Sequence, residues 1–333
     1  MLVFAIETSC DETSVCIMDK NKTIHNHTIF SQEVHQKFGG VIPEIASRAH
    51  LEILQKISKE AFLKSNVKIE EISLFAATCG PGLIGPLLIG STFAKSLAIG
   101  CSKPFVPINH IESHVLSPTF NNTISYPHLS LLISGGHTEI YLVDFKKNIS
   151  LLGESVDDAL GETFDKVAKI LNLKYPGGPE IEQFAEIGNE LEYKLPTPML
   201  KDQSLNMSFS GLKTAINLLV KKNKINNKFI SDISASFQLC VSKILISKLL
   251  KTITKLKEMS INISSISVVG GVVNNKYIRK KIIGFGKEKS VEIFFPIKEM
   301  MSDNAAMIAW AGILKTSKEE DIFFKPNPRL RIK

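Results

Sequence analysis

The sequence lacks the features that mark zinc-finger, secreted or membrane-spanning proteins. Its five cysteines are scattered, odd in number and without a Cys-x-x-Cys pair, which excludes a zinc-finger framework and fits a reducing compartment. The apolar run at the N-terminus is brief and ends at Glu7, so no signal peptide is expected. The longest apolar stretch contains Pro86, several glycines and Lys95, which disfavours a membrane span. We therefore expect a cytoplasmic protein without a membrane partner.

What the chain does contain is enough apolar sequence for two folded domains. Of its 333 residues, 44% are hydrophobic and 22% are charged, as in globular proteins, and this length suits two domains that each bury a core. The net charge of +7 at pH 7 would suit a polyanion such as RNA. Lysine, asparagine and isoleucine are plentiful throughout, however, as an AT-rich coding sequence would give, so charge alone leaves an RNA partner open.

Two strand-turn-strand patterns, one near the N-terminus and one in the middle of the chain, indicate an α/β fold. The segment LVFAIETSCDETSVCIMD reads as two short strands joined by a polar turn around Ser9–Thr13, and HLSLLISGGHTEIYLVDF repeats this design. Apolar residues run almost without a break through the first strand, which predicts a strand buried on both faces. The repetition predicts two related α/β domains with a boundary near Pro118–Pro127.

Helices are expected between and after these strands. The stretch IPEIASRAHLEILQKISKEAFLKSN has an apolar face at helical spacing. Further along, SSISVVGGVVNNKYIRKKI reads as a buried strand, a Gly-Gly turn and a helix. Near the end, SDNAAMIAWAGILK is an alanine-rich helix that Ser302 or Asp303 is placed to cap.

His110 and His114, in the segment NHIESH, are the first candidates for chemistry. Because they are four residues apart, they share one face of a helix, and this spacing lets two imidazoles reach one metal ion. Two unrelated histidines would give the same pattern. A carboxylate would complete the ligand set. Asp303 could supply it only if the fold brings the C-terminal helix across; otherwise Asp303 is simply a helix cap.

The same two histidines fit a protease site poorly. The zinc-protease signature is His-Glu-x-x-His, in which the glutamate acts as general base. Here Glu112 occupies the third of the five positions, so it would point to a different side of the helix. A metalloprotease is therefore a weak alternative.

Small-residue turns follow two of the predicted strands, at Ser134–Thr138 and at Gly270-Gly271. Backbone amides in such turns can approach phosphate oxygens, because no Cβ atom intervenes. An ordinary tight turn has the same composition, and no P-loop pattern GxxxxGK[ST] occurs. The turns are therefore candidates for phosphate binding, without a nucleotide signature.

Taken together, ten segments resemble the bacterial tRNA N6-adenosine threonylcarbamoyltransferases, the TsaD family once labelled O-sialoglycoprotein endopeptidases. They stand in the family's order from Ala5 to Gly312, so together they span nearly the whole chain. Each segment alone is modest, but ten in order are highly specific. The segments are AIETSCDETS, GGVIPEIASRAH, GPGLIGPLLIG, NHIESH, LLISGGHTEI, DDALGETFDKVAK, YPGGP, FSGLKTA, GGVVNN and SDNAAMIAWAG.

The resemblance implies a fold like that of actin, sugar kinases and the heat-shock ATPase chaperones, with two ribonuclease-H-like domains around a nucleotide cleft. The first domain would comprise residues 1–122, completed by a C-terminal helix at 302–333, and the second residues 123–301. The return of the last helix is what would bring Asp303 to the histidine pair. Two histidines and one carboxylate leave open positions, compatible with Fe(II), the first choice by resemblance, or with Zn(II).

The resemblance also implies a substrate-binding site. Carried over position by position, the substrate-binding turn consists of Ile133, Ser134, Gly135, Gly136 and His137, and the further contacts are Asp165, Gly178 and Asn275. Glu182 stands where some relatives carry an aspartate that touches the ligand, so no role is assigned to it. The catalytic residues stay unknown, with Asp11 in the N-terminal turn as one candidate proton acceptor.

The implied reaction transfers the threonylcarbamoyl group from threonylcarbamoyl-AMP to N6 of adenosine 37 in tRNAs that read codons beginning with A, and releases AMP. The expected partners are tRNA, a paralogous TsaB-like protein and a small TsaE-like ATPase. A sugar kinase of the same fold is the main alternative, but it would leave the histidine pair unexplained. A non-catalytic regulatory subunit would not need intact metal-ligand and glycine motifs.

Overall fold

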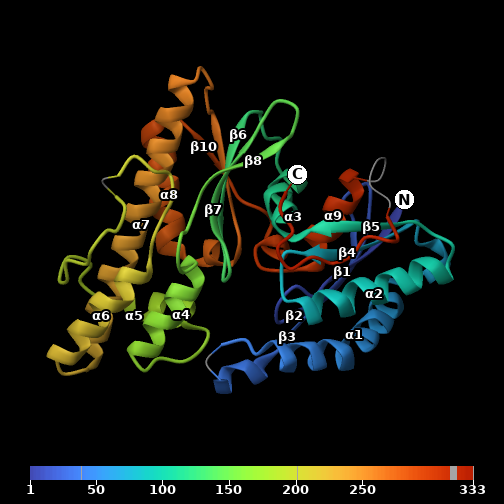
Figure 1. The fold of residues 1–333 in the computed structure, drawn as a ribbon, viewed down its shortest axis with the longest axis horizontal. Coiled ribbons are helices and arrows are strands. Elements are labelled where there is room, and N and C mark those ends of the chain that lie inside the picture. Colours follow the sequence, from blue (N-terminus) through green and yellow to red (C-terminus); the bar gives the residue numbers. More distant parts are fainter. Residues whose placement is uncertain (39, 201, 316–320, 333) are drawn as a thin grey trace. The chain divides into compact units, whose positions relative to one another are not determined.

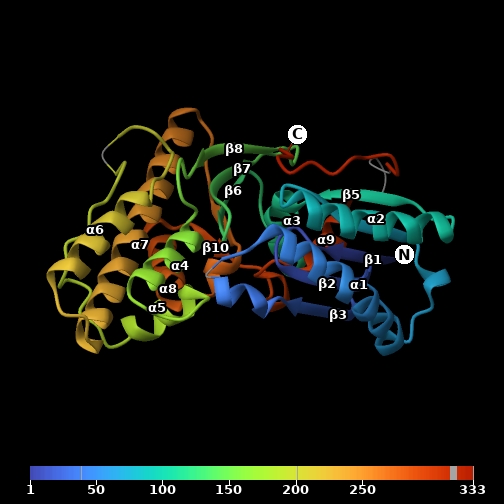
Figure 2. The same cartoon turned by 60° about the horizontal axis from the view of Figure 1, so that its bottom comes forward.

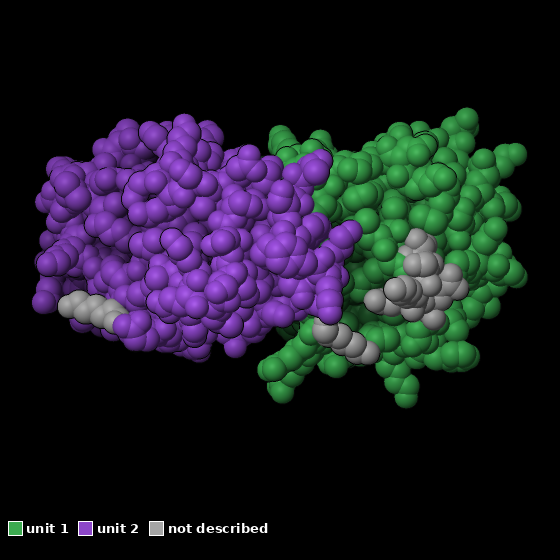
Figure 3. Space-filling model, turned by 90° about the horizontal axis from the view of Figure 1, so that it is seen from above, with its two compact units in different colours: residues 1–122, 296–333 green, residues 123–295 purple. Residues whose placement is uncertain are grey.

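The computed structural model describes residues 1–38, 40–200, 202–315 and 321–332 (Figure 1). The chain forms two compact units, which Figure 3 draws in different colours. The first unit combines Met1–Asn122 with a C-terminal segment that begins at Pro296 rather than at residue 302, and the second unit is Thr123–Phe295. Residues 316–320 and 333 of the expected C-terminal segment lie outside the described residues.

The first unit is built on a five-stranded sheet with the strand order β3-β2-β1-β4-β5. The pairs β1–β2 and β2–β3 are antiparallel, whereas β1, β4 and β5 run parallel. Apolar side chains are continuous along β1 because both faces are covered: Phe4 and Ile6 belong to one core cluster, and Val3 and Ala5 to another. The strands are β1 (Leu2–Glu7), β2 (Glu12–Asp19), β3 (Ile24–Ser31), β4 (Leu74–Gly80) and β5 (Phe105–Asn109).

Helices cover both faces of this sheet (Figure 2). Helices α1 and α2 pack on one face, and α9 packs on the other. Their bounds are α1 (Pro43–Ser65), α2 (Ile84–Gly100), α3 (His110–Leu116) and α9 (Ala305–Lys315), with 3-10 turns η1 (Glu33–Phe38), η2 (Ile69–Glu71), η3 (Ser117–Phe120) and η5 (Lys298–Met300). Among the described residues of 302–333, only α9 is helical, since residues 321–332 form turns and irregular chain.

The cap of α9 differs from the one the sequence suggested. The side-chain oxygen of Asn304 accepts a hydrogen bond from the amide of Met307 at 2.9 Å, which is the geometry of an N-cap. Neither Ser302 nor Asp303 therefore caps the helix. Because Asn304 caps α9, the Asp303 carboxylate in the loop before the helix is left for another task.

The second unit repeats the sheet of the first. Its strand order, β10-β9-β6-β7-β8, is that of the first sheet when it is read from the other edge. The pairs β6–β7 and β7–β8 are antiparallel, and β6, β9 and β10 run parallel. This confirms the prediction of two related α/β architectures. The strands are β6 (His128–Ile133), β7 (Thr138–Val143), β8 (Ile149–Glu154), β9 (Ser265–Val269) and β10 (Glu292–Phe294).

A long central helix, α7, supplies much of the second unit's core. It is the one described helix long and apolar enough to cross a membrane by length and composition, but 83% of its apolar window is buried within the protein. Burial of this kind is what a core helix of a globular unit shows. The unit's helices are α4 (Leu160–Ile170), α5 (Gly177–Ala185), α6 (Ser210–Lys222), α7 (Asn227–Glu258) and α8 (Lys276–Lys289), with the 3-10 turn η4 (Gly271–Asn274).

Candidate active site

The histidine pair lies at the carboxyl edge of the first sheet. The parallel strands β1, β4 and β5 all end there, and α3 begins directly after β5. The side chain of Asn109 caps α3 by accepting from the amide of Glu112 at 3.1 Å. This cap starts the helix at His110, so His114 falls one turn further along the same face. Both imidazoles are buried.

Asp303 joins the two histidines. Its Oδ1 atom lies 3.0 Å from Nε2 of His114 and 3.5 Å from Nε2 of His110. The three potential ligand atoms lie within 4.8 Å of one another, and they form the one such group of three found in the described part of the chain. Two imidazoles and one carboxylate facing a common point are a donor set that fits Fe(II) or Zn(II) and leaves open positions.

Further contacts hold His110 in position. Its Nδ1 atom lies 3.1 Å from the Oε2 atom of Glu7 and 3.3 Å from the hydroxyl of Ser9. Glu7 is itself fixed, because it accepts a hydrogen bond from the Thr78 hydroxyl on the neighbouring strand. A carboxylate that binds one ring nitrogen of a histidine directs the other nitrogen toward a metal and fixes the ring's orientation. The Nδ1 atom of His114 is buried, with no such partner among the described residues.

The charges of the site compensate one another. Burial lowers the pKa of His110, but Asp303 and Glu7 outweigh burial and raise it well above the usual histidine value. Burial raises the pKa of Asp303, yet the charge and hydrogen bond of His110 bring it well below its usual range. Burial lowers the pKa of His114. An arrangement that holds a proton so firmly between two carboxylates is also suited to a cation.

A second carboxyl group near Asp303 has an altered acidity. Burial, the neighbouring Asp11 and then Asp303 raise the pKa of Glu12 well above its usual value. Glu12 is the first residue of β2, and Asp11 precedes it in the turn after β1. Sequence patterns gave no reason to single out Glu12, because its acidity depends on carboxylates brought close by the fold.

The predicted substrate-binding turn lies at the carboxyl end of β6 in the second unit. Ile133 ends the strand and is buried. The amide of Ser134 donates to the carbonyl of His137 at 2.8 Å, and the His137 amide donates to the Ser134 hydroxyl at 3.1 Å. Between them, Gly135 and Gly136 are exposed and have open space where a side chain would stand. The turn therefore presents backbone that a ligand can approach closely.

Two glycines of neighbouring elements press against this turn. The amide of Gly161 in α4 donates to the carbonyl of Ser134 at 3.1 Å. A Cβ atom at Gly161 would stand 2.7 Å from that oxygen and 2.8 Å from the Cα atom of Gly135. Gly270, after the parallel strand β9, has a φ of +94° and would place a Cβ atom 2.6 Å from the carbonyl oxygen of Ile133. The β6 turn, the start of α4 and the β9 loop thus meet at one edge of the sheet.

Asp165 and Gly178 belong to the neighbouring α4–α5 pair. The Asp165 carboxylate accepts from the amide of Gly177, the first residue of α5, at 2.7 Å. Gly178 follows and has no atom within 4 Å of its Cβ position. Asp165 therefore holds the N-terminus of α5, where free backbone amides favour anions.

Both polar groups of the Asn275 side chain form hydrogen bonds within the protein. Its side-chain oxygen caps α8 by accepting from the amide of Ile278 at 2.9 Å, and its amide group donates to Gln238 at 2.6 Å. Glu182 of α5 accepts from the amide of Lys276 at 2.7 Å. The two side chains fasten the start of α8 to α7 and α5, beside the β9 loop.

One further glycine pattern occurs outside the predicted site. Gly80, Gly82 and Gly85 have the GxGxxG spacing of a dinucleotide-binding loop between β4 and α2. Protein atoms fill the space beside them: Cβ atoms would stand 2.0 Å from the Asn327 carbonyl oxygen, 2.6 Å from that of Ser9 and 2.3 Å from a serine hydroxyl of α1. These glycines serve close packing, not the approach of a pyrophosphate.

The family model that matches the chain is that of TsaD, tRNA N6-adenosine threonylcarbamoyltransferase, over residues 22–310. The chain belongs to this family. It is 43% identical to the enzyme of that name from Wolbachia pipientis wMel, over 98% of this chain and 97% of the relative. It is 45% identical to the enzyme from Thermosipho africanus over the full length of both chains. The chain is therefore a transferase of a tRNA-modifying family.

Solved structures agree with the fold expected of the tRNA N6-adenosine threonylcarbamoyltransferase family. HypF from T. kodakarensis aligns with a TM-score of 0.62 at 14% identity, over 95% of this chain and 48% of HypF. Component A of the (R)-2-hydroxyglutaryl-CoA dehydratase from Acidaminococcus fermentans aligns with a TM-score of 0.53 at 15% identity, over 96% and 99% of the two chains. These neighbours confirm the fold class of actin, heat-shock ATPases and sugar kinases.

Proposed function

We propose that the chain transfers the threonylcarbamoyl group from threonylcarbamoyl-AMP to N6 of adenosine 37 in tRNAs that read codons beginning with A. Family membership supports the transfer to tRNA. The observation that carries the proposal within the structure is the convergence of His110, His114 and Asp303, with ligand atoms within 4.8 Å of one another. A sugar-kinase function would leave this group unexplained.

The chemistry explains why the donor is an adenylate. The exocyclic amine of adenosine is a poor nucleophile, so the carbamoyl carbon must arrive activated, as a mixed anhydride with phosphate. A bond forms between N6 and that carbon, the carbon–oxygen bond to phosphate breaks, and AMP leaves with the electron pair. The protein positions the two substrates and stabilises the charge that develops. Adenosine 37 suits this attack because it lies in a single-stranded loop, from which a base can be splayed into a pocket.

The turn Ile133–His137 would bind the AMP part of the donor. Gly135 and Gly136 offer backbone without side chains, and Gly178 offers the amide end of α5, both suited to a phosphate. Asp165 would act by holding α5 in place, because its carboxylate binds the amide of Gly177. Asn275 would contribute through its place in the β9 loop, which its two side-chain hydrogen bonds fix.

His110, His114 and Asp303 would hold one divalent metal ion, Fe(II) in first place and Zn(II) as the alternative. When bound there, such an ion would supply a Lewis acid for the threonylcarbamoyl group. Glu7 fixes the orientation of the His110 ring through its hydrogen bond to Nδ1. Asp11 would accept the proton that N6 loses, since it lies in the turn next to Glu12 at the same edge of the first sheet.

The proposal also includes two helper proteins and a cytoplasmic location. A TsaB-like paralogue and a small TsaE-like ATPase would assist the enzyme, while a separate enzyme makes the adenylate. The reaction on tRNA and the free cysteines both fit the cytoplasm.

Purified protein, alone and together with the TsaB-like and TsaE-like helper proteins, incubated with unmodified tRNA and threonylcarbamoyl-AMP provides the test. Digestion of the tRNA and mass analysis of its nucleosides should show N6-threonylcarbamoyladenosine, with one AMP released for each modified adenosine. His110→Ala and Asp303→Ala variants should lose the activity. Full activity after complete metal removal would sink the metal assignment, and turnover of ATP on a sugar in place of tRNA modification would favour the kinase.

A further inference from the structure

Basic side chains are distributed unevenly over the second unit. Residues 201–295 contain 17 Lys and Arg against 5 Asp and Glu, whereas residues 123–200 contain 6 against 12. Helix α8 alone has 6 basic residues and 1 acidic residue among its 14 positions. No other α-helix in the described part of the chain has so high a net positive charge. Among the described helices, α8 is therefore the strongest candidate for a polyanion-binding surface.

Three of these lysines form a line on the exposed side of α8. Lys276, Lys280 and Lys287 are exposed, while Ile278 and Ile282 on the other side of the helix are buried in the core. At a rise of about 1.5 Å per residue, the line extends for about 16 Å along the helix. We refer to these three residues as the lysine stripe.

Within the described part of the chain, no lysine of the stripe forms an ion pair. The ion pairs that α8 does form there use Lys281, with Glu190 at 3.7 Å, and Lys289, with Glu288 at 2.8 Å. The stripe's three ammonium groups are therefore available to an anionic partner.

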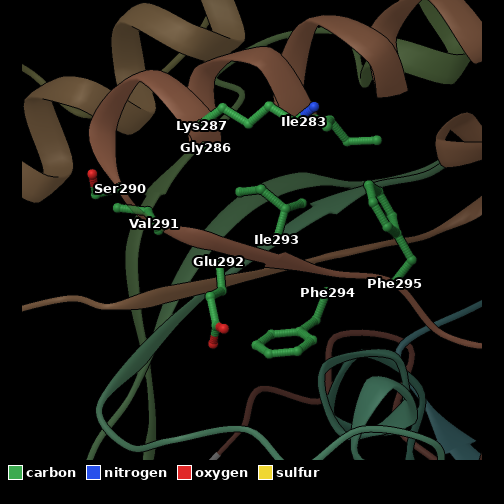
Figure 4. A pocket seen from close by; sticks show the side chains of 9 residues that line it. All are labelled: Ile283, Gly286, Lys287, Ser290, Val291, Glu292, Ile293, Phe294 and Phe295. Carbon is green, nitrogen blue, oxygen red and sulfur yellow. The ribbon is translucent and has the colours of Figure 1, made fainter.

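An apolar hollow adjoins the far end of the stripe. It has a volume of about 520 Å³ and lies between the last turns of α8 and strand β10, with Lys287 in its lining (Figure 4). Figure 4 shows Ile293 and Phe295 pointing toward α8 and Ile283, while Glu292 points away. The Arg279 guanidinium lies 4.0 Å from the centre of the Phe295 ring. Lysines and an aromatic-lined hollow thus share one face.

This face starts at the proposed substrate site. Helix α8 begins just after Asn275, in the loop that follows β9. Strands β6 and β9 are parallel neighbours, so that loop and the turn Ser134–His137 lie at the same edge of the second sheet. The lysine stripe consequently begins at this edge, and an RNA bound along it would reach the turn.

We propose that the lysine stripe and the adjoining hollow bind tRNA, with phosphates on the lysines and one unstacked base in the hollow. The inference rests on the proposed function, which supplies the tRNA and the adenylate-binding turn. Positively charged grooves beside aromatic side chains are how proteins hold single-stranded RNA. A protein partner fits less well, because lysine is depleted in protein–protein interfaces. The surface thus gives tRNA a binding site separate from that of the adenylate.

The test uses the full-length enzyme with its helper proteins and an unmodified tRNA transcript. In one variant, Lys276, Lys280 and Lys287 are all replaced by Gln, and the KM for tRNA is measured at several salt concentrations. We expect the KM to rise about tenfold or more at low salt, with kcat and the KM for threonylcarbamoyl-AMP within about twofold of wild type. The slope of log affinity against log salt should fall by about 2, as for three lost contacts to a single strand.

A matched control replaces Lys221, Lys222 and Lys224 by Gln, since they are exposed, lie in the same unit and change the net charge equally. The control should bind tRNA as the wild type does; an equal loss there would assign the effect to net charge and overturn the proposal. An Ile283→Ser variant tests the hollow and should weaken tRNA binding without changing the salt slope.

Two outcomes separate this inference from the proposed function. Wild-type protein that modifies tRNA, together with a triple variant of unchanged tRNA affinity and salt slope, would refute the lysine stripe alone. Wild-type protein that neither binds nor modifies tRNA would refute the proposed function, and the inference with it. A variant that changes only the oligomeric state would mean that the surface binds protein rather than RNA.

Discussion

Replacing Gly161 by alanine tests whether the turn Ser134–His137 binds substrate. The added Cβ atom would stand 2.7 Å from the carbonyl oxygen of Ser134, 2.8 Å from the Cα atom of Gly135 and 3.0 Å from its amide nitrogen. All three neighbours are backbone atoms, so no side-chain rotation relieves the contact. The turn must move by several tenths of an ångström, or α4 must retreat from it.

The expected cost follows from these contacts. Overpacking by one methyl group destabilises a protein by about 1–3 kcal/mol, and a shift of about 1 Å in a binding group can reduce catalysis about 100-fold. Since the shift here is smaller, we expect kcat/KM for threonylcarbamoyl-AMP to fall about 10- to 100-fold. The KM for tRNA should change little, because the lysine stripe is untouched.

The assay is the release of AMP at varied threonylcarbamoyl-AMP concentration, with thermal unfolding measured alongside. Gly100→Ala is the control, because the last residue of α2 has no atom within 4 Å of its Cβ position. It should keep full activity. A Gly161→Ala enzyme with kcat/KM within twofold of the wild type would refute a substrate-binding role for the turn, provided that its folding is intact.

Three further predictions concern the metal site and the two cores. Glu7→Gln should weaken metal binding about 10- to 100-fold in a chelator competition, whereas Glu112→Gln, on the same helix as His110, should bind as the wild type does. Burial lowers the pKa of His128 to about 4, so below pH 6.5 the unfolded chain takes up a proton that the folded chain refuses. The free energy of unfolding should therefore fall by about 3 kcal/mol as the pH drops from 6.5 to 4. Urea titrations should show that the His128→Leu variant lacks this loss. A variant with the same pH dependence as the wild type would contradict the role of His128. Asn304→Ala should lower the free energy of unfolding by about 1 kcal/mol through loss of the α9 cap, and an unaltered denaturation midpoint would argue against that cap.

Local pattern was sufficient for several elements and for the paired α/β architecture, but not for the long helix α7 (Asn227–Glu258). The strand-turn-strand segments, the Gly-Gly turns and the helical spacing of His110 and His114 all appear in the structure where periodicity places them. Such patterns depend on residues close together in the chain, which the sequence displays directly. The α9 cap was predicted wrongly, because three consecutive polar residues, Ser302 to Asn304, can each cap a helix and only the helix's packing selects Asn304.

The histidine pair of the proposed metal site was placed by the sequence, and the approach of a third candidate ligand was decided by tertiary structure. A spacing of four residues sets His110 and His114 on one face of α3 regardless of the rest of the chain. That Asp303 lies 3.0 Å from His114, and that Glu7 orients His110, depends on β1, β5 and the start of α9 meeting at one edge. Burial there and the nearness of opposite charges then set the acidities of the site. These are properties of groups far apart in sequence, so no local pattern contains them.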